Sequence, residues 1–547
     1  MILQKAKLSK ILTKLGQIGT VRAGLLSVSL MLTPGATLAL EQYTPFKQAL
    51  AEAVSYSPQV AAYYKENKFE AIWIGGPKEN ARLRALIDTI TVADRHALPV
   101  ARYNLQGLLD MLASVRSPQD MASAEARLTK IYLTLAQDMQ TGVLVPSSID
   151  EHIKRKVEVR TADEHLQGIT TSDPAKYLRS LAPNTGEYTR LMKEKLRLAS
   201  VIKNGGWGTP LSTKPVKPGA EGTRVVELRN RLMKMGFLQR SVSQRYDAKL
   251  ENAVRDFQEA HGLEPDGVAG EGTLKEINVS PQQRLRSVVV AMERERWLNM
   301  PEGRGERHIL VNLTDFSARV LDNDVETFRT RSVIGKNTSD RQSPEFSDEM
   351  EHMVINPTWH VPRSIAVKEY LPRLQRNPAA LGHLTLVDRR GYVVDRASAD
   401  FTQFTPRTFP YSIKQRPSKR NALGLVKFMF PNRYNIYLHD TPEKHLFSRE
   451  TRAFSHGCIR LQQPFEFAYH LLAAQEDDPK DFFQRTLATR KEAYVNLEKH
   501  VPVHIIYRTV FTTAKGEVHF RRDVYGRDAK IWNALQDAGV SLPDVRG

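Results

Sequence analysis

The sequence predicts an α+β protein built from several domains. Residues 41–204 carry apolar residues at helical spacing, whereas from about residue 307 onward apolar and polar residues alternate with a period of two. A break rich in glycine and proline at 205–218 separates these halves and is followed by a short stretch with three amphipathic helices. We therefore expect a helical scaffold, a small three-helix unit and a mainly β domain, in that order.

The first 39 residues have the features of a secretory signal. Five basic residues and no acidic residue accompany a short apolar run at 23–32, and small residues follow it up to Ala39. This order predicts export with cleavage after Ala39, and an uncleaved membrane anchor is the alternative. The apolar run is shorter than the roughly 20 residues that a membrane-spanning helix needs.

The chain is strongly basic. Its net charge is +18, and the first 39 residues contribute five positive and no negative charges, which leaves +13 for the remainder. A basic surface fits an anionic partner. The export signal argues against nucleic acid, so we expect a polyanionic cell wall or a membrane surface.

Residues 41–204 form the predicted helical scaffold domain. Four stretches, at 49–64, 82–89, 122–141 and 188–203, place apolar residues at helix spacing opposite charged faces. This segment shows no cluster of catalytic residue types, and its tryptophan and tyrosines fit a hydrophobic core.

Residues 219–279 follow the linker at 205–218 and form the small helical unit. Residues 225–232 predict a first helix that stops near Gly236, residues 250–261 predict a second, and a third begins at Thr273. The order of these apolar, glycine and histidine positions resembles the three-helix peptidoglycan-binding domain of cell-wall enzymes. An unrelated helical bundle is the alternative.

Residues 280–305 predict a connecting helix, residues 306–511 the mainly β domain, and residues 512–547 a C-terminal segment. Strands are expected at 308–313, 317–321, 328–334, 350–356, 503–511 and 518–524, and helices at 365–375 and 464–474. Residues 359–420 interrupt the strands with six of the prolines and many basic and aromatic residues. A long insertion in a compact domain is often functional, so we expect a lid over the functional site; a surface decoration is the alternative.

Cys458 is the only cysteine of the 547 residues and lies in Ser455-His456-Gly457-Cys458-Ile459-Arg460. A lone cysteine is usually a small buried apolar residue. Here export, polar neighbours and an adjacent glycine favour a reactive free thiol instead. His439, which ends the alternating run 434–439, is the candidate base, and His456 is the rival because residues two apart in an extended segment share a face.

The remaining candidate site residues surround this pair. The amides of Gly457 and the cysteine itself are suited to an oxyanion hole, and the carbonyl of Asp440 is suited to orienting the base. Tyr437, Arg460 and Asp440 are the candidate substrate-contacting residues. The tyrosine fits a packed position equally well, and the arginine fits either a substrate carboxylate or a structural ion pair. No tight spacing of metal ligands recurs, so the sequence predicts no metal and no cofactor.

The segment from Tyr437 to Arg460 resembles the signature of the YkuD-type L,D-transpeptidases, a histidine followed by Ser/Thr-His-Gly-Cys-x-Arg. Phe-Met-Phe-Pro-Asn at 428–432, the insertion and the helical scaffold resemble the large YcbB-like branch. Many smaller members have glycine after the first histidine, where this sequence has Asp440. The resemblance extends over nearly all of the chain after residue 40 and is strongest at 305–511.

The resemblance implies a cysteine acyltransferase of the periplasm that needs no cofactor. Cys458 would attack the amide between the third and fourth residues of a peptidoglycan stem, release D-Ala as a thioester forms, and pass the acyl group to an amine of a neighbouring stem, giving a 3→3 crosslink. Implied partners are stem peptides, glycan strands and wall-synthesis proteins, and carbapenems are implied covalent inhibitors. The alternatives are an L,D-carboxypeptidase, an enzyme coupling protein to the wall, and an inactive wall-binding scaffold, against which the intact His439 and Cys458 argue.

Overall fold

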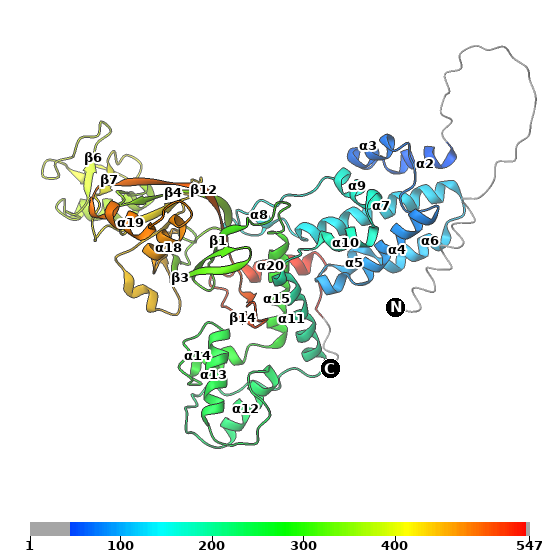
Figure 1. The fold of residues 1–547 in the computed structure, drawn as a ribbon, viewed down its shortest axis with the longest axis horizontal. Helices are drawn as coiled ribbons and strands as arrows, with labels where there is room; N and C mark the ends of the chain where they lie inside the picture. Colours follow the sequence, from blue (N-terminus) through cyan, green and yellow to red (C-terminus); the bar gives the residue numbers. More distant parts are fainter. Residues whose placement is uncertain (1–43, 543–547) are drawn as a thin grey trace, which may run out of the picture.

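The computed structural model describes residues 44–542 (Figure 1), so the predicted signal at 1–39 lies outside the described residues. A helical N-terminal region leads into a small helical unit and then into a β-rich domain, which confirms the predicted multidomain α+β fold. Between residues 44 and 542, the structure contains no helix with the length and apolarity that crossing a membrane requires.

The N-terminal region is a bundle of helices arranged around a long buried one. Its elements are α2 (Pro45–Ala53), α3 (Pro58–Glu66), α4 (Pro77–Thr91), η1 (Ala93–His96), α5 (Val100–Tyr103), α6 (Leu105–Ser114), α7 (Pro118–Thr141), α8 (Pro146–Ile149), α9 (Ala162–Thr171), α10 (Pro174–Leu181) and α11 (Gly186–Lys203). Ser117 starts α7 with a capping box that includes Asp120. The stretch expected at 49–64 is two helices, because Ser57 caps a new helix that begins at Pro58.

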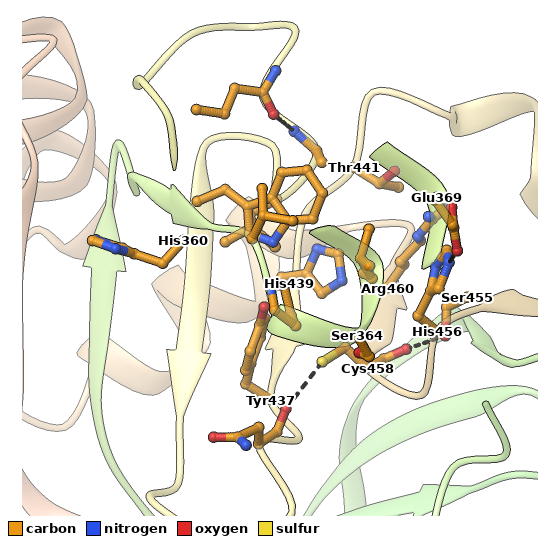
Figure 2. A pocket seen from close by; sticks show the side chains of 18 of the residues that line it. His360, Ser364, Glu369, Tyr437, His439, Thr441, Ser455, His456, Cys458 and Arg460 are labelled. Atoms are coloured by element: carbon orange, nitrogen blue, oxygen red, sulfur yellow. Dashed lines mark hydrogen bonds and ion pairs between the residues drawn. The ribbon is translucent and has the colours of Figure 1, made fainter. Parts of the chain in front are cut away.

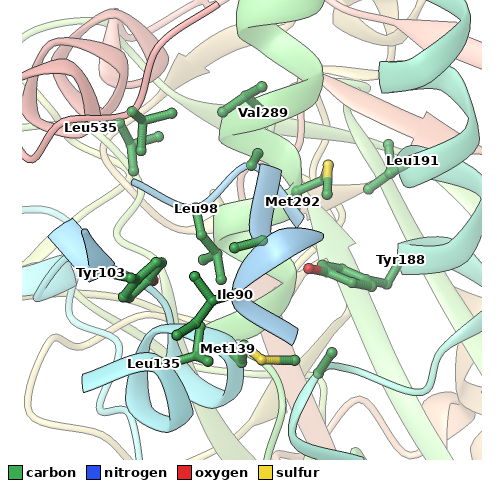
Figure 3. Packing of buried hydrophobic residues seen from close by; sticks show 14 of the residues in the cluster. Ile90, Leu98, Tyr103, Leu135, Met139, Tyr188, Leu191, Val289, Met292 and Leu535 are labelled. Carbon is green, nitrogen blue, oxygen red and sulfur yellow. The ribbon is translucent and has the colours of Figure 1, made fainter. Parts of the chain in front are cut away.

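Helix α15 (Pro281–Arg296) lies within the segment 280–305 that was expected to form a connecting helix, and the domains pack around it. Figure 3 shows its Val289 and Met292 among side chains of α7, α11 and the C-terminal helix α20 (Arg527–Asp537). Its Arg294 forms buried ion pairs with Glu345 at 2.5 Å, just before the barrel strand β4, and with Asp528 of α20 at 3.2 Å. The segment expected as a C-terminal extension therefore belongs to the junction between helices and barrel.

The small helical unit consists of α12 (Thr223–Met235), α13 (Ala248–Ala260) and α14 (Glu271–Ile277). Gly236 ends α12 in a left-handed conformation with φ of 92°, which glycine adopts without steric cost. The unit rests on the hairpin of β13 (Val510–Thr512) and β14 (Val518–Phe520), where the rings of His261 and Phe520 stack with centroids 5.5 Å apart.

The β-rich domain is a sheet closed on itself. Its strands are β1 (Arg307–Asn312), β2 (Ser317–Asp322), β3 (Val325–Gly335), β4 (Phe346–Ile355), β8 (Val426–Met429), β9 (Leu438–His439), β10 (Ala453–Ser455), β11 (Ile459–Leu461) and β12 (Ala493–Ile506). They follow the order β10-β3-β11-β9-β8-β4-β12-β1-β2, and a further pairing of β2 with β3 closes the barrel. Helices α18 (Pro464–Leu472) and α19 (Pro479–Ala488) add Phe467 and Phe483 to its core.

Two expected strands differ from the structure. The strand expected at 503–511 is divided, because its first part belongs to β12 of the barrel and its last part to β13 of the separate hairpin. The alternating run at 434–439 is a strand only at Leu438–His439, since Asn435 takes a positive φ of 55° that interrupts the extended backbone.

The insertion at 359–420 is a folded subdomain with its own sheet and core. It contains β5 (Trp359–His360), α16 (Arg363–Ile365), the π-helical turn η2 (Ala366–Tyr370), α17 (Leu371–Arg376), β6 (Thr385–Val387), η3 (Phe401–Gln403) and β7 (Ser412–Gln415), with strand order β5-β7-β6. Its core is formed by Leu374, Leu386, Phe401, Phe409 and Ile413, which explains the aromatic residues of this stretch.

A stability prediction arises from Glu125, which is fully buried in α7. Its carboxylate accepts hydrogen bonds from the amides of Ile72, Trp73 and Ile74 at 2.5, 3.1 and 3.2 Å. We expect Glu125→Leu to destabilise the helical region by about 3 kcal/mol, because buried amides would lose their acceptor. Glu125→Gln, which keeps one acceptor oxygen, should lose about half as much.

The measurement is calorimetric unfolding, resolved by region with hydrogen exchange because a multidomain chain does not unfold in one step. A Glu125→Leu protein that melts together with the wild type would show that this carboxylate does not organise the 72–74 turn.

Candidate active site

A cavity of about 820 Å³ lies between the barrel and the insertion. Residues of the barrel form its floor, namely Tyr437, His439, Cys458 and Arg460. Residues of the insertion form the opposite wall (Figure 2). The insertion residues that line it include Trp359, Pro362, Ser364, Glu369 and Tyr370. The insertion therefore lies over the barrel residues that the sequence singles out.

Strand pairing explains how residues nineteen apart in the sequence share this floor. Strands β9 and β11 run parallel, with Leu438 opposite Ile459 and His439 opposite Arg460, and the Ile459 amide donates to the Tyr437 carbonyl at 3.1 Å. Cys458 comes directly before β11 and therefore lies beside the end of β9. Both Cys458 and His439 line the cavity, and Figure 2 shows their side chains on its barrel side.

His439 is held as a neutral imidazole. Its Nδ1 lies 2.5 Å from the Asp440 carbonyl oxygen, which only accepts, so this contact assigns the proton to Nδ1. The backbone of Leu423 makes a second hydrogen bond with the ring. Burial, followed by the positive charge of Arg460, lowers the pKa of His439 to about 3. The ring is thus equipped to accept a proton.

Cys458 is a thiol in this arrangement. Its Sγ donates to the Asn435 carbonyl at 3.4 Å. Burial raises the pKa of Cys458 to about 11, although hydrogen bonds from Tyr437 and the charge of Arg460 act in the opposite direction. The resting cavity therefore holds a neutral thiol and a neutral imidazole, and a base has to remove the thiol proton during attack.

The loop before Cys458 depends on Gly457, whose φ is 118°. The Gly457 amide donates to Ser455 Oγ at 3.1 Å, and Ser455 Oγ donates to the Cys458 carbonyl at 2.5 Å. The expectation that the Gly457 amide faces an oxyanion is therefore wrong for this structure, since that amide is used within the loop. Among residues 44–542, the Cys458 amide has no hydrogen-bond acceptor and is the amide left for that role.

His456 faces the insertion. Its Nε2 lies 2.6 Å from Glu369 Oε1, and Arg341 Nη2 binds the same oxygen at 2.8 Å. Figure 2 shows His456 beside Glu369 and turned away from the sulfur. The expected shared face with Cys458 fails because the left-handed Gly457 interrupts the extended chain between them.

The three candidate substrate-contacting residues separate into two groups. Tyr437 and Arg460 line the cavity, and the arginine forms an ion pair with Glu443 at its edge. Asp440 does not line it, because its buried carboxylate accepts from the Leu425 amide at 2.9 Å and pairs with Lys444 at 2.6 Å. Its side chain is thus a structural anchor, which corrects the substrate-contact expectation, while its carbonyl holds His439.

Sequence reasoning did not identify the contributions of Glu369, Arg341, Asn435 and Ser455. The first two come from distant segments that only the fold brings to the cysteine loop, whereas Ser455 lies inside the motif and could have been considered as its internal hydrogen-bonding residue.

Within the described part of the chain, no group of three or more His, Cys, Asp or Glu side chains is placed to hold a metal ion.

A pH prediction follows from these two pKa values. Because the thiol pKa is raised to about 11, alkylation of Cys458 by iodoacetamide should rise about tenfold per pH unit from pH 7 to 9.5. No step is expected near the usual histidine range, since His439 is already neutral above pH of about 3. The single cysteine lets intact mass spectrometry follow the reaction. A rate that is flat from pH 6 upward would instead indicate a preformed thiolate–imidazolium pair.

The fold and site define a multidomain protein whose barrel domain carries a cysteine and a neutral histidine at the floor of a covered cavity. Residues 306–505 match the model of the L,D-transpeptidase catalytic domain, YkuD, and residues 221–277 match one described as "Putative peptidoglycan binding domain". Residues 58–194 match a model described as a scaffold domain. The chain thus contains a YkuD-type L,D-transpeptidase catalytic domain and a peptidoglycan-binding domain.

Two individual proteins are similar to this chain. A Haemophilus influenzae protein named "Putative L,D-transpeptidase" is 30% identical over 263 residues, which are 47% of this chain and 50% of that protein. The chain therefore spans about half the length of this curated relative. A crystal structure of the L,D-transpeptidase from Xylanimonas cellulosilytica matches 55% of this chain and 100% of that one at 13% identity, but its TM-score of 0.16 supports no conclusion about the fold.

Proposed function

We propose that this protein is a periplasmic L,D-transpeptidase that forms 3→3 crosslinks between peptidoglycan stem peptides. The observation that carries the proposal is that Cys458 and the neutral His439 line one cavity, inside the matched catalytic domain and under the insertion. The helical scaffold and the insertion support the large YcbB-like branch. The same site chemistry makes carbapenems the expected covalent inhibitors.

In the first half-reaction, Cys458 Sγ attacks the carbonyl carbon of the third stem residue while His439 Nε2 takes the thiol proton. The Cys458 amide donates to the oxyanion, and the Tyr437 hydroxyl lies close enough to the sulfur to assist. The tetrahedral intermediate breaks its C–N bond, D-Ala leaves with the proton from His439, and a thioester remains.

In the second half-reaction, an amine of a neighbouring stem attacks the thioester and His439 accepts the amine proton. The C–S bond breaks, the proton returns to the sulfur, and a new amide joins the two stems. The insertion favours this outcome because a covered cavity keeps water from competing with the amine. A site more open to water would give the carboxypeptidase reaction.

Product analysis tests the proposal. The chain from residue 40 onward is incubated with purified disaccharide-tetrapeptide, and the products are separated and identified by mass spectrometry. A dimer that has lost one D-Ala is the expected product. Tripeptide without dimer would identify an L,D-carboxypeptidase, and binding to wall sacculi without any product would identify a wall-binding scaffold.

The contact between Glu369 and His456 gives a further prediction. Glu369→Ala removes the oxygen that joins η2 of the insertion to the cysteine loop and to Arg341. We expect carbapenem acylation to slow by about fivefold, because a partly exposed ion pair contributes about 1 kcal/mol to the closed arrangement. The ratio of tripeptide to dimer should rise as water enters.

Lys368→Ala is the matched control, since it removes the neighbouring exposed pair with Asp340 but leaves the cysteine loop untouched. Equal kinetics and equal product ratios in both variants would show that the insertion is held by other contacts.

A further inference from the structure

A second cavity, of about 370 Å³, lies where the small helical unit meets the barrel. Segments 259–265 of the helical unit, 314–316 and 448–452 of the barrel, and 521–524 after the hairpin line it. It shares no lining residue with the cavity above Cys458. Two regions that match different domain models thus build one concave surface.

Two half-buried arginines in this cavity are bound to carbonyl oxygens. Arg452 donates to the carbonyls of Ser332 at 3.2 Å and Arg449 at 2.9 Å, and also reaches those of 315 and 316. Arg521 donates to the carbonyls of Ala260 at 3.0 Å and Phe520 at 2.7 Å. Carbonyls fix a guanidinium in place but leave its charge unneutralised, and neither side chain forms an ion pair within the described residues.

The local charge balance is positive. The buried carboxylate of Asp315 acts electrostatically on both arginines, but it is already paired with Arg319 and, at 3.7 Å, with Arg329. Burial, with Arg331 next, lowers the pKa of Arg452 to about 10. Burial also lowers that of Arg521 to about 10, with Arg329 and Arg319 acting in the same direction.

Acidic residues at the rim change this balance little. Glu450 is paired with Arg522 at 2.9 Å, and Glu259 and Glu264 are exposed at the side of the helical unit. Exposed Arg331 and Arg449 stand on the barrel side without an acidic partner among residues 44–542. The wall of the cavity is therefore cationic, with a few acids at its edge.

We propose that this junction cavity binds a carboxylate of a peptidoglycan stem peptide and so holds a second stem while the first occupies the cavity above Cys458. The proposal rests on the proposed function, since it takes its ligand from that reaction. The exposed guanidinium groups of Arg331 and Arg449 are suited to bind a carboxylate through paired hydrogen bonds, and the fixed charges of Arg452 and Arg521 add to the attraction. The acidic rim suits the amine that the same stem carries. The helical unit would then contribute to a binding site that it completes only together with the barrel.

Equilibrium titration with disaccharide-tetrapeptide tests this site. All proteins carry Cys458→Ala so that the fragment is not consumed. Arg331→Glu with Arg449→Glu reverses two exposed charges of the cavity and leaves the structural Arg452 and Arg521 in place. Arg240→Glu with Lys499→Glu is the control, with the same change in net charge at exposed positions outside both cavities.

We expect the parent and the control to bind two equivalents, and the Arg331/Arg449 variant to bind the second at least about tenfold more weakly. A fragment with its carboxylates converted to amides should not fill the second site in any of the proteins. Equal titrations of variant and control would overturn the proposal. Equally tight binding of poly-glutamate would overturn the stem peptide as ligand, because the cavity would then select charge alone.

The crosslinking assay separates this failure from a failure of the proposed function. Dimer formation by the protein with Cys458, combined with equal titrations, would remove only the second stem site. Absence of any product would remove the proposed reaction, whatever the titration shows.

Discussion

A Cys458→Ala protein is expected to form neither crosslinked dimer nor tripeptide from disaccharide-tetrapeptide, a loss of at least about 10⁴-fold in rate. The physical reason is that no other group among the described residues of the cavity floor is a comparable nucleophile: His439 is the base, and Tyr437 has a pKa raised by burial and by the adjacent sulfur. Carbapenem adducts should be absent as well. Mass spectrometry of protein and products measures both losses.

Cys458→Ser is the informative companion, because it keeps the size of the side chain and loses most of its nucleophilicity. Both variants should melt close to the temperature of the wild type, since the thiol's hydrogen bonds with the Asn435 carbonyl and with Tyr437 are weak sulfur contacts. Product formation by Cys458→Ala at more than a hundredth of the wild-type rate would place the nucleophile elsewhere.

A His439→Gln protein is expected to acylate about 10³-fold more slowly, within the range typical for loss of a general base. Because the thiol pKa lies near 11, few molecules hold a thiolate at neutral pH without a base. The residual rate of the variant should therefore rise with pH, following the thiolate fraction, whereas the wild-type rate should depend on pH less steeply. Carbapenem acylation from pH 6 to 9.5 provides the measurement.

His456→Gln is the matched control, since it changes the other histidine of the site in the same way. We expect a loss of about tenfold or less, with the pH profile of the wild type, because His456 binds Glu369 and not the sulfur. A His456 variant as slow as the His439 variant would contradict the choice of base.

Local sequence patterns predicted what depends on local structure. Helical spacing identified the segments of α7 and α11, and period-two alternation identified β1, β2 and β3. The motif at 455–460 and the run at 434–439 pointed to Cys458 and His439, which line the same cavity. The helices and strands were predictable because neighbours in the sequence determine their periodicity.

Long-range pairing determined what the sequence did not reveal. The parallel contact of β9 with β11, which brings His439 to Cys458, requires a crossover whose partner strands are only two and three residues long. The positive φ of Gly457 reverses the side on which His456 lies. The burial of Asp440 depends on the Leu425 amide, and the contact of Glu369 depends on a π-helical turn inside the insertion. None of these features has a periodic signal.

Trapping the acyl-enzyme tests the central claim most directly. The wild-type chain is mixed with disaccharide-tetrapeptide, quenched in acid within seconds and measured by intact and peptide-level mass spectrometry. We expect an adduct of the fragment minus D-Ala on the peptide that contains Cys458, released by hydroxylamine as a thioester is, and absent from Cys458→Ala. Crosslinked product formed without any adduct on Cys458, at times shorter than one turnover and longer, would contradict the thioester mechanism.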